Sequence, residues 1–441
     1  MRSPRLRQLV FLSTTIGTMI EQYDFLLYGA LAATLFNKLF FPSLDPLVGT
    51  LASLGTFAVG TTGRPIGAFL AGHFGDRTGR KSMLLIGFTV MGISSAAVGL
   101  LPTYATIGVW APTLLIVLRF LQGISLGIEQ SSAAVLAVEH APPESRGVWG
   151  SFPAIGSFAG LLLAYGSISL LSKVSGDAFE IWGWRIPFLA SIVLLLIGLL
   201  IRSSLPESKA FMDIATNRTK ARFPLIDVFR QRPLEILIAN TITFSNFGWV
   251  TLVLVITGPY MTNYLKLPQS EALDAIAIAA VIAMTISVPI IGHLSDRLGR
   301  RPILLTGGLL LALSGWPYFA LIKTKDTLSI TVAIVWGVAV VIPLSFGVTS
   351  AFFAEMFETN IRLSGFAVGQ QIGIMAGGFV VPMFATYVLA KTNGETWPIS
   401  LFCVGMGGVM IVATLLANET RVRKLSDSSA TALPLQSTEL L

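Results

Sequence analysis

Two acidic residues, Glu21 and Asp24, lie three positions apart in an apolar stretch that runs from about residue 9 to residue 36. On an α-helix such residues share a face, and Tyr28 extends that face by one more turn. Two neighbouring carboxylates cannot both carry a charge cheaply in a low-dielectric environment, so a mobile arginine nearby can decide whether one of them holds a proton. The pattern is typical of a proton switch.

Three further ionisable residues, Arg64, Arg119 and Glu129, interrupt apolar runs. A charge at the centre of a bilayer costs roughly 2.5–3.5 kcal/mol and therefore often marks function. Arg119 and Glu129 fall on one helical stripe with Gln122, but about 15 Å apart along the axis, so they need different partners. We predict proton-coupling roles for Asp24, Glu21, Arg119 and Glu129. The alternative is a set of static ion pairs that fix the helix register.

The second half of the chain carries neutral polar and aromatic residues at similar depth. Asn246 and Trp249 are three apart and can share a helix face. A guanidinium can hold a carboxylate through two hydrogen bonds, which makes arginine a candidate substrate ligand. Interhelical hydrogen bonding is the alternative role for the neutral residues. The candidate substrate-binding residues are Arg64, Tyr28, Gln122, Asn246, Trp249 and Gln370.

One ten-residue pattern occurs twice, as GHFGDRTGRK at 72–81 and as GHLSDRLGRR at 292–301. Two acid–arginine pairs with identical spacing, Glu139 with Arg146 and Glu355 with Arg362, repeat in the same way. Such duplication indicates a transporter built from two related halves. The glycines are expected to permit tight turns, and the repeated Asp to accept hydrogen bonds at a helix N-terminus. We predict a gating role for Asp76, Arg77, Arg80, Glu139, Arg146, Asp296, Arg300, Glu355 and Arg362.

The composition places these elements in a membrane. Hydrophobic residues make up 53% of the chain and charged residues 12%, whereas a soluble domain carries roughly 25% charged residues. Runs of about 20 apolar residues predict twelve transmembrane helices. Their expected positions are 9–36, 48–72, 82–101, 109–138, 148–172, 184–202, 234–263, 272–293, 302–322, 327–353, 364–390 and 397–417. The expected units are a six-helix half at 1–202, a cytoplasmic linker at 203–233, a second half at 234–417 and a tail at 418–441.

Lys and Arg gather in alternate loops, including the loop after the sixth helix, to which we assign Arg202. This bias predicts that both termini are cytoplasmic. The net charge of +7 does not indicate nucleic-acid binding, because the basic residues lie in short loops between apolar runs. His73, His140 and His293 stand one per loop, so we expect them to be solvated and predict neither a metal nor a cofactor. The expected partners are a small molecule, a proton and the lipid bilayer, with a monomeric protein.

Several stretches resemble a known family. The twin loops resemble the loop signature of the major facilitator superfamily, and four other stretches are similar to its metabolite:proton symporter family: 17–25 (GTMIEQYDF), 64–67 (RPIG), 121–127 (LQGISLG) and 184–188 (WRIPF). The resemblance covers nearly the whole chain. It implies a twelve-helix bundle, alternating access and proton-coupled uptake of a small organic metabolite across a bacterial inner membrane. The chain departs from the family at Gln22, Ile128 and Gln130, which puts the substrate of any single relative in doubt.

The leading hypothesis is a symporter for a carboxylate-bearing metabolite. An importer of a zwitterion such as proline or betaine is the alternative, and the charge moved per cycle distinguishes the two. Drug or metabolite efflux is less favoured, because residues 150–156 lack the Gly-Pro-centred pattern of efflux relatives. We do not expect an enzyme, since the sequence shows no soluble domain, metal cluster, nucleophile pair or phosphate loop.

Overall fold

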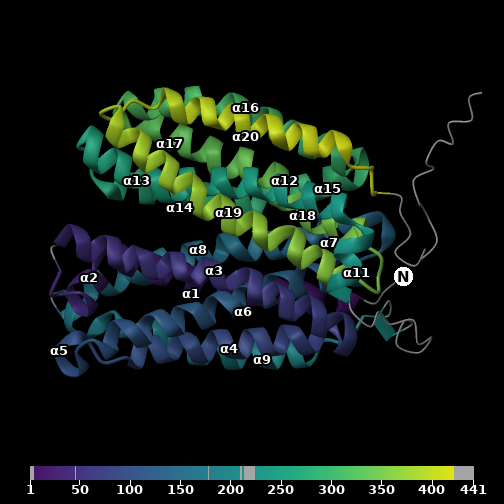
Figure 1. Cartoon of the computed structure of the whole chain (residues 1–441), viewed down its shortest axis with the longest axis horizontal. Coiled ribbons are helices and arrows are strands. Elements are labelled where there is room, and N and C mark those ends of the chain that lie inside the picture. The colour runs from purple at the N-terminus through teal and green to yellow at the C-terminus, as the bar shows by residue number, and fades with distance from the viewer. Residues whose placement is uncertain (1–3, 45, 177, 209–210, 213–223, 422–441) are drawn as a thin grey trace, which may run out of the picture.

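Long helices run back and forth between the two ends of the molecule (Figure 1). The computed structural model describes residues 4–44, 46–176, 178–208, 211–212 and 224–421. Short helices α2 (Phe36–Phe40), α5 (Tyr104–Ile107) and α7 (Arg146–Gly150) lie in the connections. The long helices of the first half are α1 (Pro4–Thr34), α3 (Pro46–Thr78), α4 (Arg80–Leu100), α6 (Trp110–His140), α8 (Phe152–Ser175) and α9 (Arg185–Ser203).

The second half repeats this arrangement, preceded by α11 (Pro224–Gln231). Three of its spans contain π-helical turns, at 252–256 and 261–265, at 283–287 and at 336–341. Its elements are α12 (Pro233–Thr251), α13 (Thr257–Tyr260), α14 (Gln269–Ile282), α15 (Val288–Leu298), α16 (Arg300–Lys323), α17 (Thr327–Val335), α18 (Ile342–Met356), α19 (Arg362–Lys391) and α20 (Trp397–Leu416).

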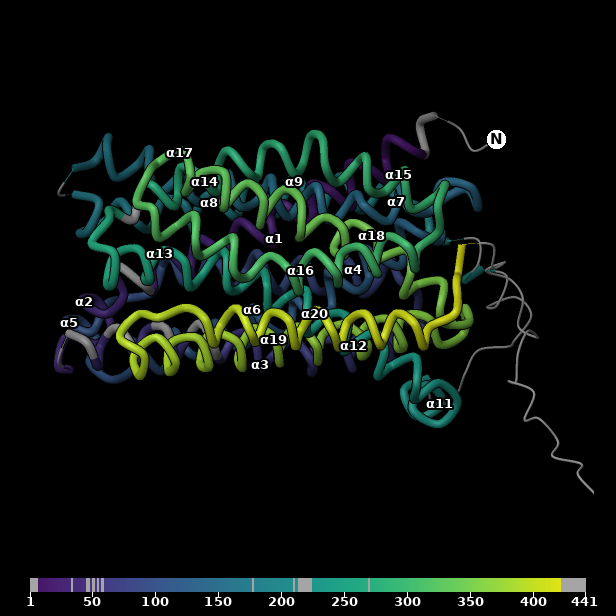
Figure 2. The backbone as a smooth tube through the Cα atoms, turned by 90° about the horizontal axis from the view of Figure 1, so that it is seen from above, coloured from purple at the N-terminus to yellow at the C-terminus, as the bar shows by residue number. Residues whose placement is uncertain are grey.

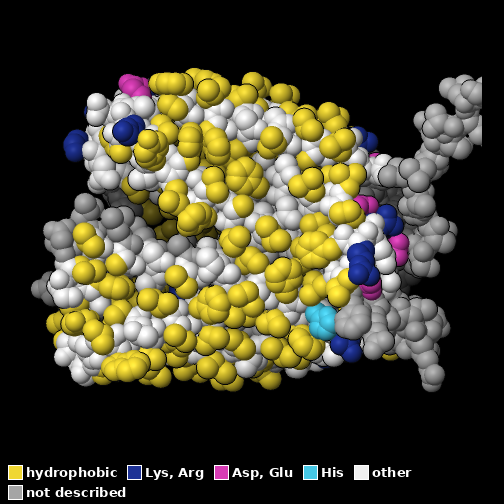
Figure 3. Space-filling model, in the orientation of Figure 1, with side chains coloured by type: hydrophobic (Ala, Val, Ile, Leu, Met, Phe, Trp, Pro, Cys, Tyr) yellow, Lys and Arg dark blue, Asp and Glu magenta, His cyan; other side chains and the backbone are white. Residues whose placement is uncertain are grey.

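Ten helices of the described chain are long and apolar enough to cross a membrane. The helices α1 and α3, with 31 and 33 residues, run beside them and complete the predicted set of twelve. The flanks of the bundle are apolar, with side chains such as Leu100, Val174 and Leu200 more than 60% exposed. Figure 3 shows hydrophobic side chains along the flanks and charged side chains at the ends. The all-α membrane architecture with two six-helix halves is therefore confirmed.

The two ends of the bundle differ. We call the end at which α3 stops and α4 begins the basic end, since it gathers Arg80, Arg146, Arg300 and Arg362. The first and last described helices also have their outer ends there (Figure 1). At the opposite end, Figure 3 shows a hollow between the two halves. Within the predicted linker, residues 209–210 and 213–223 lie outside the described chain, as do residues 422–441 of the predicted tail.

Glycines set the close packing of α3 on α6. A Cβ atom added to Gly123 would lie 1.8 Å from the carbonyl oxygen of Gly60, and one added to Gly67 would lie 1.9 Å from that of Ile124. In a membrane, helices associate through such small residues because no hydrophobic effect drives them together. Gly60 also leaves room for the Arg119 side chain, whose Nε would lie 2.7 Å from an added Cβ. The glycine pattern thus brings the polar stripe of α6 against α3.

The repeated loop differs from the expectation at two glycines. Gly72 and Gly75 lie inside α3, and only Gly79, with a φ of +120°, makes the turn before α4. A Cβ atom at Gly72 would lie 2.7 Å from the Cα atom of Ser364 in α19. The two glycines therefore allow the halves to approach, because α3 and α19 run side by side (Figure 2).

We expect Gly67→Ala to destabilise the bundle by roughly 1–3 kcal/mol, because its methyl group overlaps the backbone of α6. Gly166→Ala is the matched control, since an added Cβ at Gly166 in α8 meets no atom within 4 Å. Thermal unfolding of the two purified variants in detergent measures the difference. Equal melting temperatures would contradict the assigned packing.

Candidate functional site

Asp24 lies inside the first half, away from lipid and water. Its side chain is 0% exposed, and its Oδ1 accepts a 2.5 Å hydrogen bond from the Ser191 hydroxyl of α9. Its Oδ2 is buried without a hydrogen-bond partner in the part of the chain that the structure describes. The charge of Arg119 acts on it from α6. A buried acid with an unpartnered oxygen beside a guanidinium is suited to gaining and losing a proton.

Arg119 is held by aromatic faces and by an amide. Its Cζ atom lies 4.6 Å from the ring centre of Phe25 and 4.3 Å from that of Tyr28. Its Nη1 donates to Gln122, which donates in turn to the Ser95 hydroxyl. The Tyr28 hydroxyl hydrogen-bonds Thr56 of α3 at 2.5 Å. Of the predicted residues, Asp24, Tyr28, Arg119 and Gln122 thus form one polar cluster in the first half.

Glu129 has a partner that the sequence analysis placed elsewhere. Arg202, assigned above to a solvated loop, is the penultimate residue of α9 and is 0% exposed. It donates to both carboxylate oxygens of Glu129, with Nη1 2.7 Å from Oε2. A basic residue at the end of an apolar run looks in sequence like any residue of a positive loop, so no signal marked Arg202 as a buried partner.

Arg64 bridges the two halves. Its Nε donates to Oε1 of Gln371 in α19 at 2.9 Å, and its Nη2 donates to Oε1 of Gln130 in α6 at 2.5 Å. Glu21 is 0% exposed, and both of its carboxylate oxygens lack a hydrogen-bond partner among the described residues. Gln371 and Gln130 are not among the predicted site residues, because the spacing of amides along a helix does not show which of them contacts an arginine of another helix.

Two of the three candidates in the second half lie apart from these clusters. Asn246 donates to the hydroxyl of Ser345. Trp249 is 1% exposed, and its indole N–H donates to the Gly337 carbonyl at 3.2 Å. Gln370 is also buried and accepts a contact of 3.4 Å from Gln371. Only Gln370 of these three thus lies next to the Arg64 bridge.

Asp76 fastens the first half to the second at the basic end. Its carboxylate accepts hydrogen bonds from the backbone N–H groups of Leu363 and Ser364, at 3.2 and 2.9 Å, where α19 begins. The N-terminus of a helix presents free N–H groups and a partial positive charge, so an acid is favourable there. Burial raises the cost of an unpaired charge, and Arg80 lies 3.2 Å from Asp76 to offset it.

Asp296 forms the mirror contact. It accepts hydrogen bonds from the N–H groups of Gly147 and Val148, at 2.7 and 3.0 Å, in the short helix α7 of the first half. Arg300 lies 2.8 Å from Asp296, as Arg80 does from Asp76. The two copies of the repeated loop therefore each cap a helix of the opposite half.

Two further pairs cross between the halves at this end. Arg362 donates to Glu139 at 2.9 Å, and Arg146 lies 3.7 Å from Glu355. Arg77 lies outside these contacts, on the surface beside His73. We call the remaining eight predicted gating residues the basic-end network: Asp76, Arg80, Glu139, Arg146, Asp296, Arg300, Glu355 and Arg362.

Both halves add residues to the network that the sequence analysis missed. Ser208 donates to Glu139, and Thr420 donates to Glu355 at 2.7 Å. The preceding acids, Glu207 and Glu419, accept backbone N–H groups at the starts of α4 and α16. A Glu followed by a hydroxyl residue occurs after the last helix of each half, and this repetition was the sequence signal that could have identified these residues. His140, expected to be solvated, is instead buried in the last turn of α6, with 3% of its side chain exposed.

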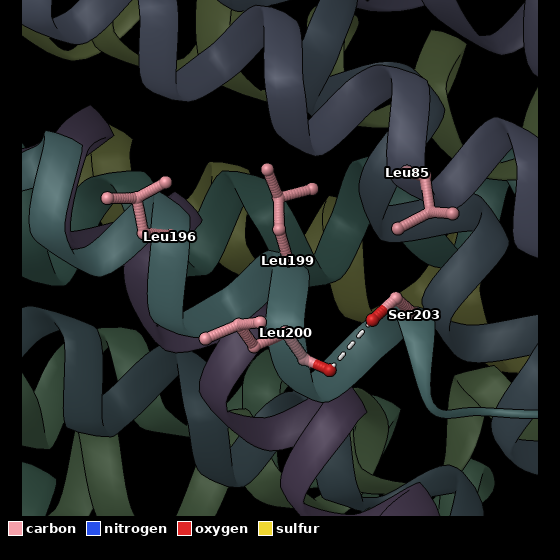
Figure 4. A pocket seen from close by; sticks show the side chains of 5 residues that line it. All are labelled: Leu85, Leu196, Leu199, Leu200 and Ser203. Atoms are coloured by element: carbon pink, nitrogen blue, oxygen red, sulfur yellow. Dashed lines mark hydrogen bonds between the residues drawn. The ribbon is translucent and has the colours of Figure 1, made fainter.

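A groove of about 520 Å³ lies on the flank between α4 and α9 (Figure 4). Its lining is apolar except for Ser203, whose hydroxyl donates to the Leu200 carbonyl. Leu196 and Leu200 are more than half exposed on the apolar flank. The groove therefore faces lipid and offers no free polar group to a charged solute. It is lined by Leu85, Leu196, Leu199, Leu200 and Ser203.

We expect Asp76→Asn to loosen the basic end, because the amide NH2 would replace the oxygen that accepts from one of the two N–H groups, and the amide has no charge to offset Arg80. Distances between spin labels on α3 and α15 in the reconstituted protein measure the separation of the halves. Arg77→Gln, which removes a surface charge from the same loop, is the control. An unchanged distance distribution in Asp76→Asn would contradict the latch.

Glu419 gives a pH-dependent contribution to stability. Burial raises the pKa of its carboxyl, but backbone N–H groups of Arg300, Arg301, Arg421 and Thr420 lower it, and the pKa lies below its ordinary value. A lowered folded-state pKa stabilises the fold above the unfolded pKa of about 4.3, and that stability is lost as the pH falls further.

We therefore expect Glu419→Gln to lower the melting temperature at pH 7 and to have progressively less effect below about pH 4.3. Thermal unfolding at the two pH values measures the effect. The control is Glu395→Gln, because Glu395 forms an exposed pair with Lys323. A Glu419→Gln variant as stable as the wild type at pH 7 would refute the assignment.

Comparison with known proteins agrees with this architecture. Residues 10–234 match the family model described as "Sugar (and other) transporter", and residues 241–437 match "Major Facilitator Superfamily". The chain resembles the solved proton:xylose symporter XylE bound to 6-bromo-6-deoxy-D-glucose, with a TM-score of 0.78 at 20% identity over 96% of this chain and 98% of the other. An inward-open conformation of XylE from E. coli gives a TM-score of 0.65, at 19% identity over 95% and 98% of the two chains. At such identities the likeness concerns the fold.

Several curated relatives are closer in sequence. An inner membrane metabolite transport protein of Escherichia coli is 36% identical over 95% of this chain and 96% of its own length. The shikimate transporter of the same organism is 35% identical over 93% and 94% of the two chains, and its proline/betaine transporter is 33% identical over 96% and 86%. With these matches and the twelve-helix fold, the chain belongs to the major facilitator superfamily and is a transporter of small molecules.

Proposed function

We propose that the protein is a proton-coupled symporter that imports a small, carboxylate-bearing metabolite by alternating access. The observation that carries this proposal is the buried cluster of Asp24 and Arg119. Asp24 has one unpartnered oxygen, and the guanidinium that acts on it rests on two aromatic rings. Such an acid can take up a proton from one side of the membrane and release it when the arginine moves closer.

The conformation supports a cycle in which access alternates. The basic-end network closes one end, while a hollow lies between the halves at the other (Figure 3). We assign the basic end to the cytoplasm, because Lys and Arg are enriched in cytoplasmic loops. The structure then corresponds to the state open toward the outside. Residues 1–202 and 234–417 would rock against each other, and the region 203–233 would link them.

The relatives support two substrate classes. One relative is named as a shikimate transporter, which supports a substrate with a carboxylate group. A guanidinium such as that of Arg119 can bind such a group. A relative named as a proline/betaine transporter makes a zwitterion the second candidate. A monoanion that enters with one proton moves no net charge, whereas a zwitterion with one proton moves +1. The second process responds to membrane potential by about 2.3 kcal/mol per 100 mV.

We expect Asp24→Asn to lose at least tenfold in proton-driven accumulation while it retains exchange of solute across the membrane, since the amide cannot release a proton. Uptake of labelled shikimate, proline and glycine betaine into proteoliposomes at two external pH values, with the membrane potential clamped, measures both processes. Ser191→Ala, which removes the hydroxyl donor but keeps the acid, is the control and should keep pH-driven accumulation. Full accumulation by Asp24→Asn would remove Asp24 from the coupling role.

A further inference from the structure

Glu21 is an acid that the Asp24 cluster does not use. It is wholly buried, and neither oxygen accepts a hydrogen bond within the described chain. The charges that act on it are those of Glu129 in α6, Arg64 in α3 and Arg202 in α9, and none of the three hydrogen-bonds it. The helix α8 packs most extensively on α1 but contains a single Lys, Arg, Asp or Glu, Lys173 in its last turn. An ionised carboxylate without hydrogen bonds would be costly here, so this conformation holds Glu21 as the neutral acid.

Arg202 forms an ion pair with a different carboxylate, that of Glu129. It donates to both oxygens of Glu129, and its Cζ lies 4.0 Å from the ring centre of Phe88. Its guanidinium also fills the space beside Gly17, where an added Cβ would lie 1.5 Å from Nη2. The paired Glu129 and Arg202 neutralise each other, and Arg64 is the remaining cation that faces Glu21.

Arg64 is held away from Glu21 by amides. It donates hydrogen bonds to Gln371 and Gln130, and Gln371 donates to Gln130 at 3.1 Å, which orients both amides. The bond to Gln371 crosses from α3 to α19, the same two helices that Asp76 joins. Arg64 stands twelve residues before Asp76, or about 18 Å along the helix. A separation of α3 from α19 that begins at Asp76 and extends about 18 Å along α3 would break this bond.

We propose that Gln371 is a positioning residue that keeps Arg64 from Glu21 while the basic end is closed, so that opening this end drives the proton off Glu21. When α19 withdraws, Arg64 turns to the Glu21 carboxyl group. The O–H bond of Glu21 breaks, its proton passes to water that enters from the basic end, and the carboxylate left behind pairs with Arg64. This inference rests on the proposed proton coupling. It adds Glu21 as a second protonatable site, whose protonation depends on whether the basic end is closed.

The experiment measures the gate without any solute. Spin labels at Phe74→Cys and Leu298→Cys, which are 45% and 61% exposed at the basic end of different halves, report the separation of the halves in liposomes. The native Cys403 is fully buried, so it does not compete for the label. Because opening requires ionised Glu21, the open population of the wild type should rise with pH.

Three variants of the full chain fix the sign of the effect. Gln371→Leu removes a contact of the closed state, so its midpoint should move to lower pH by about one unit, as expected for the loss of a charge-assisted hydrogen bond. Gln371→Glu strengthens that contact and should move the midpoint to higher pH. Glu21→Gln cannot ionise and should stay closed at every pH. Glu180→Gln is the control, since Glu180 is an exposed acid that pairs with Lys38 away from the basic end, and it should keep the wild-type transition.

Wild-type midpoints in Gln371→Leu and Glu21→Gln, or no pH-dependent opening in the wild type, would overturn the inference. If Gln371→Leu does not fold, the opposite shift of Gln371→Glu decides the matter alone. The proposed function fails separately. If the variants shift the midpoint but the wild type shows no proton-driven uptake, the gate responds to pH and the protein is not a symporter. If the wild type shows proton-driven uptake but the variants do not shift the midpoint, the protein is a symporter and Gln371 does not control Glu21.

Discussion

Every charge that this bundle removes from water must find its partner within the protein, because lipid supplies none. At the basic end, that constraint joins the two halves. Asp76 and Asp296 each satisfy N–H groups of the opposite half, and Arg362 and Arg146 face acids across the interface. Water can replace such contacts when the halves separate, whereas a continuous apolar core would resist separation. The contacts at the basic end therefore hold the two halves together and can still be exchanged for water when this end opens.

The same constraint shapes the interior of the first half. Glycines on α3 and α6 allow these helices to touch, and the space that they leave admits Arg119 beside its aromatic neighbours. Phe25 lies between the two arginines of this region, 4.6 Å from Arg119 and 5.9 Å from Arg64. The acids and arginines are thus close enough to influence one another without all being paired. A proton that binds here can change which arginine an acid holds, and this change can reach the interface between the halves through Arg64.

Periodicity and duplication predicted much of this structure. The apolar runs located the helices, and the repeated loops predicted a network that now includes eight of the nine candidate residues. The role of Gly72 and Gly75 could not be predicted from the neighbouring sequence, because both glycines contact α19, which follows nearly 300 residues later. Arg202 looked like one more loop cation because only the fold brings it to Glu129. Gln370 was predicted as a site residue in place of its neighbour Gln371 for a related reason: only the fold shows which of the two adjacent amides contacts Arg64.

The central claim is that solute and proton move together through this protein. Its most direct test is the external pH of a suspension of wild-type proteoliposomes, recorded with a pH-sensitive dye as shikimate, proline or glycine betaine is added without an imposed gradient. The account predicts that the transported solute makes the external medium more alkaline at a rate proportional to its own labelled influx. Solute influx with no change in external pH would contradict it.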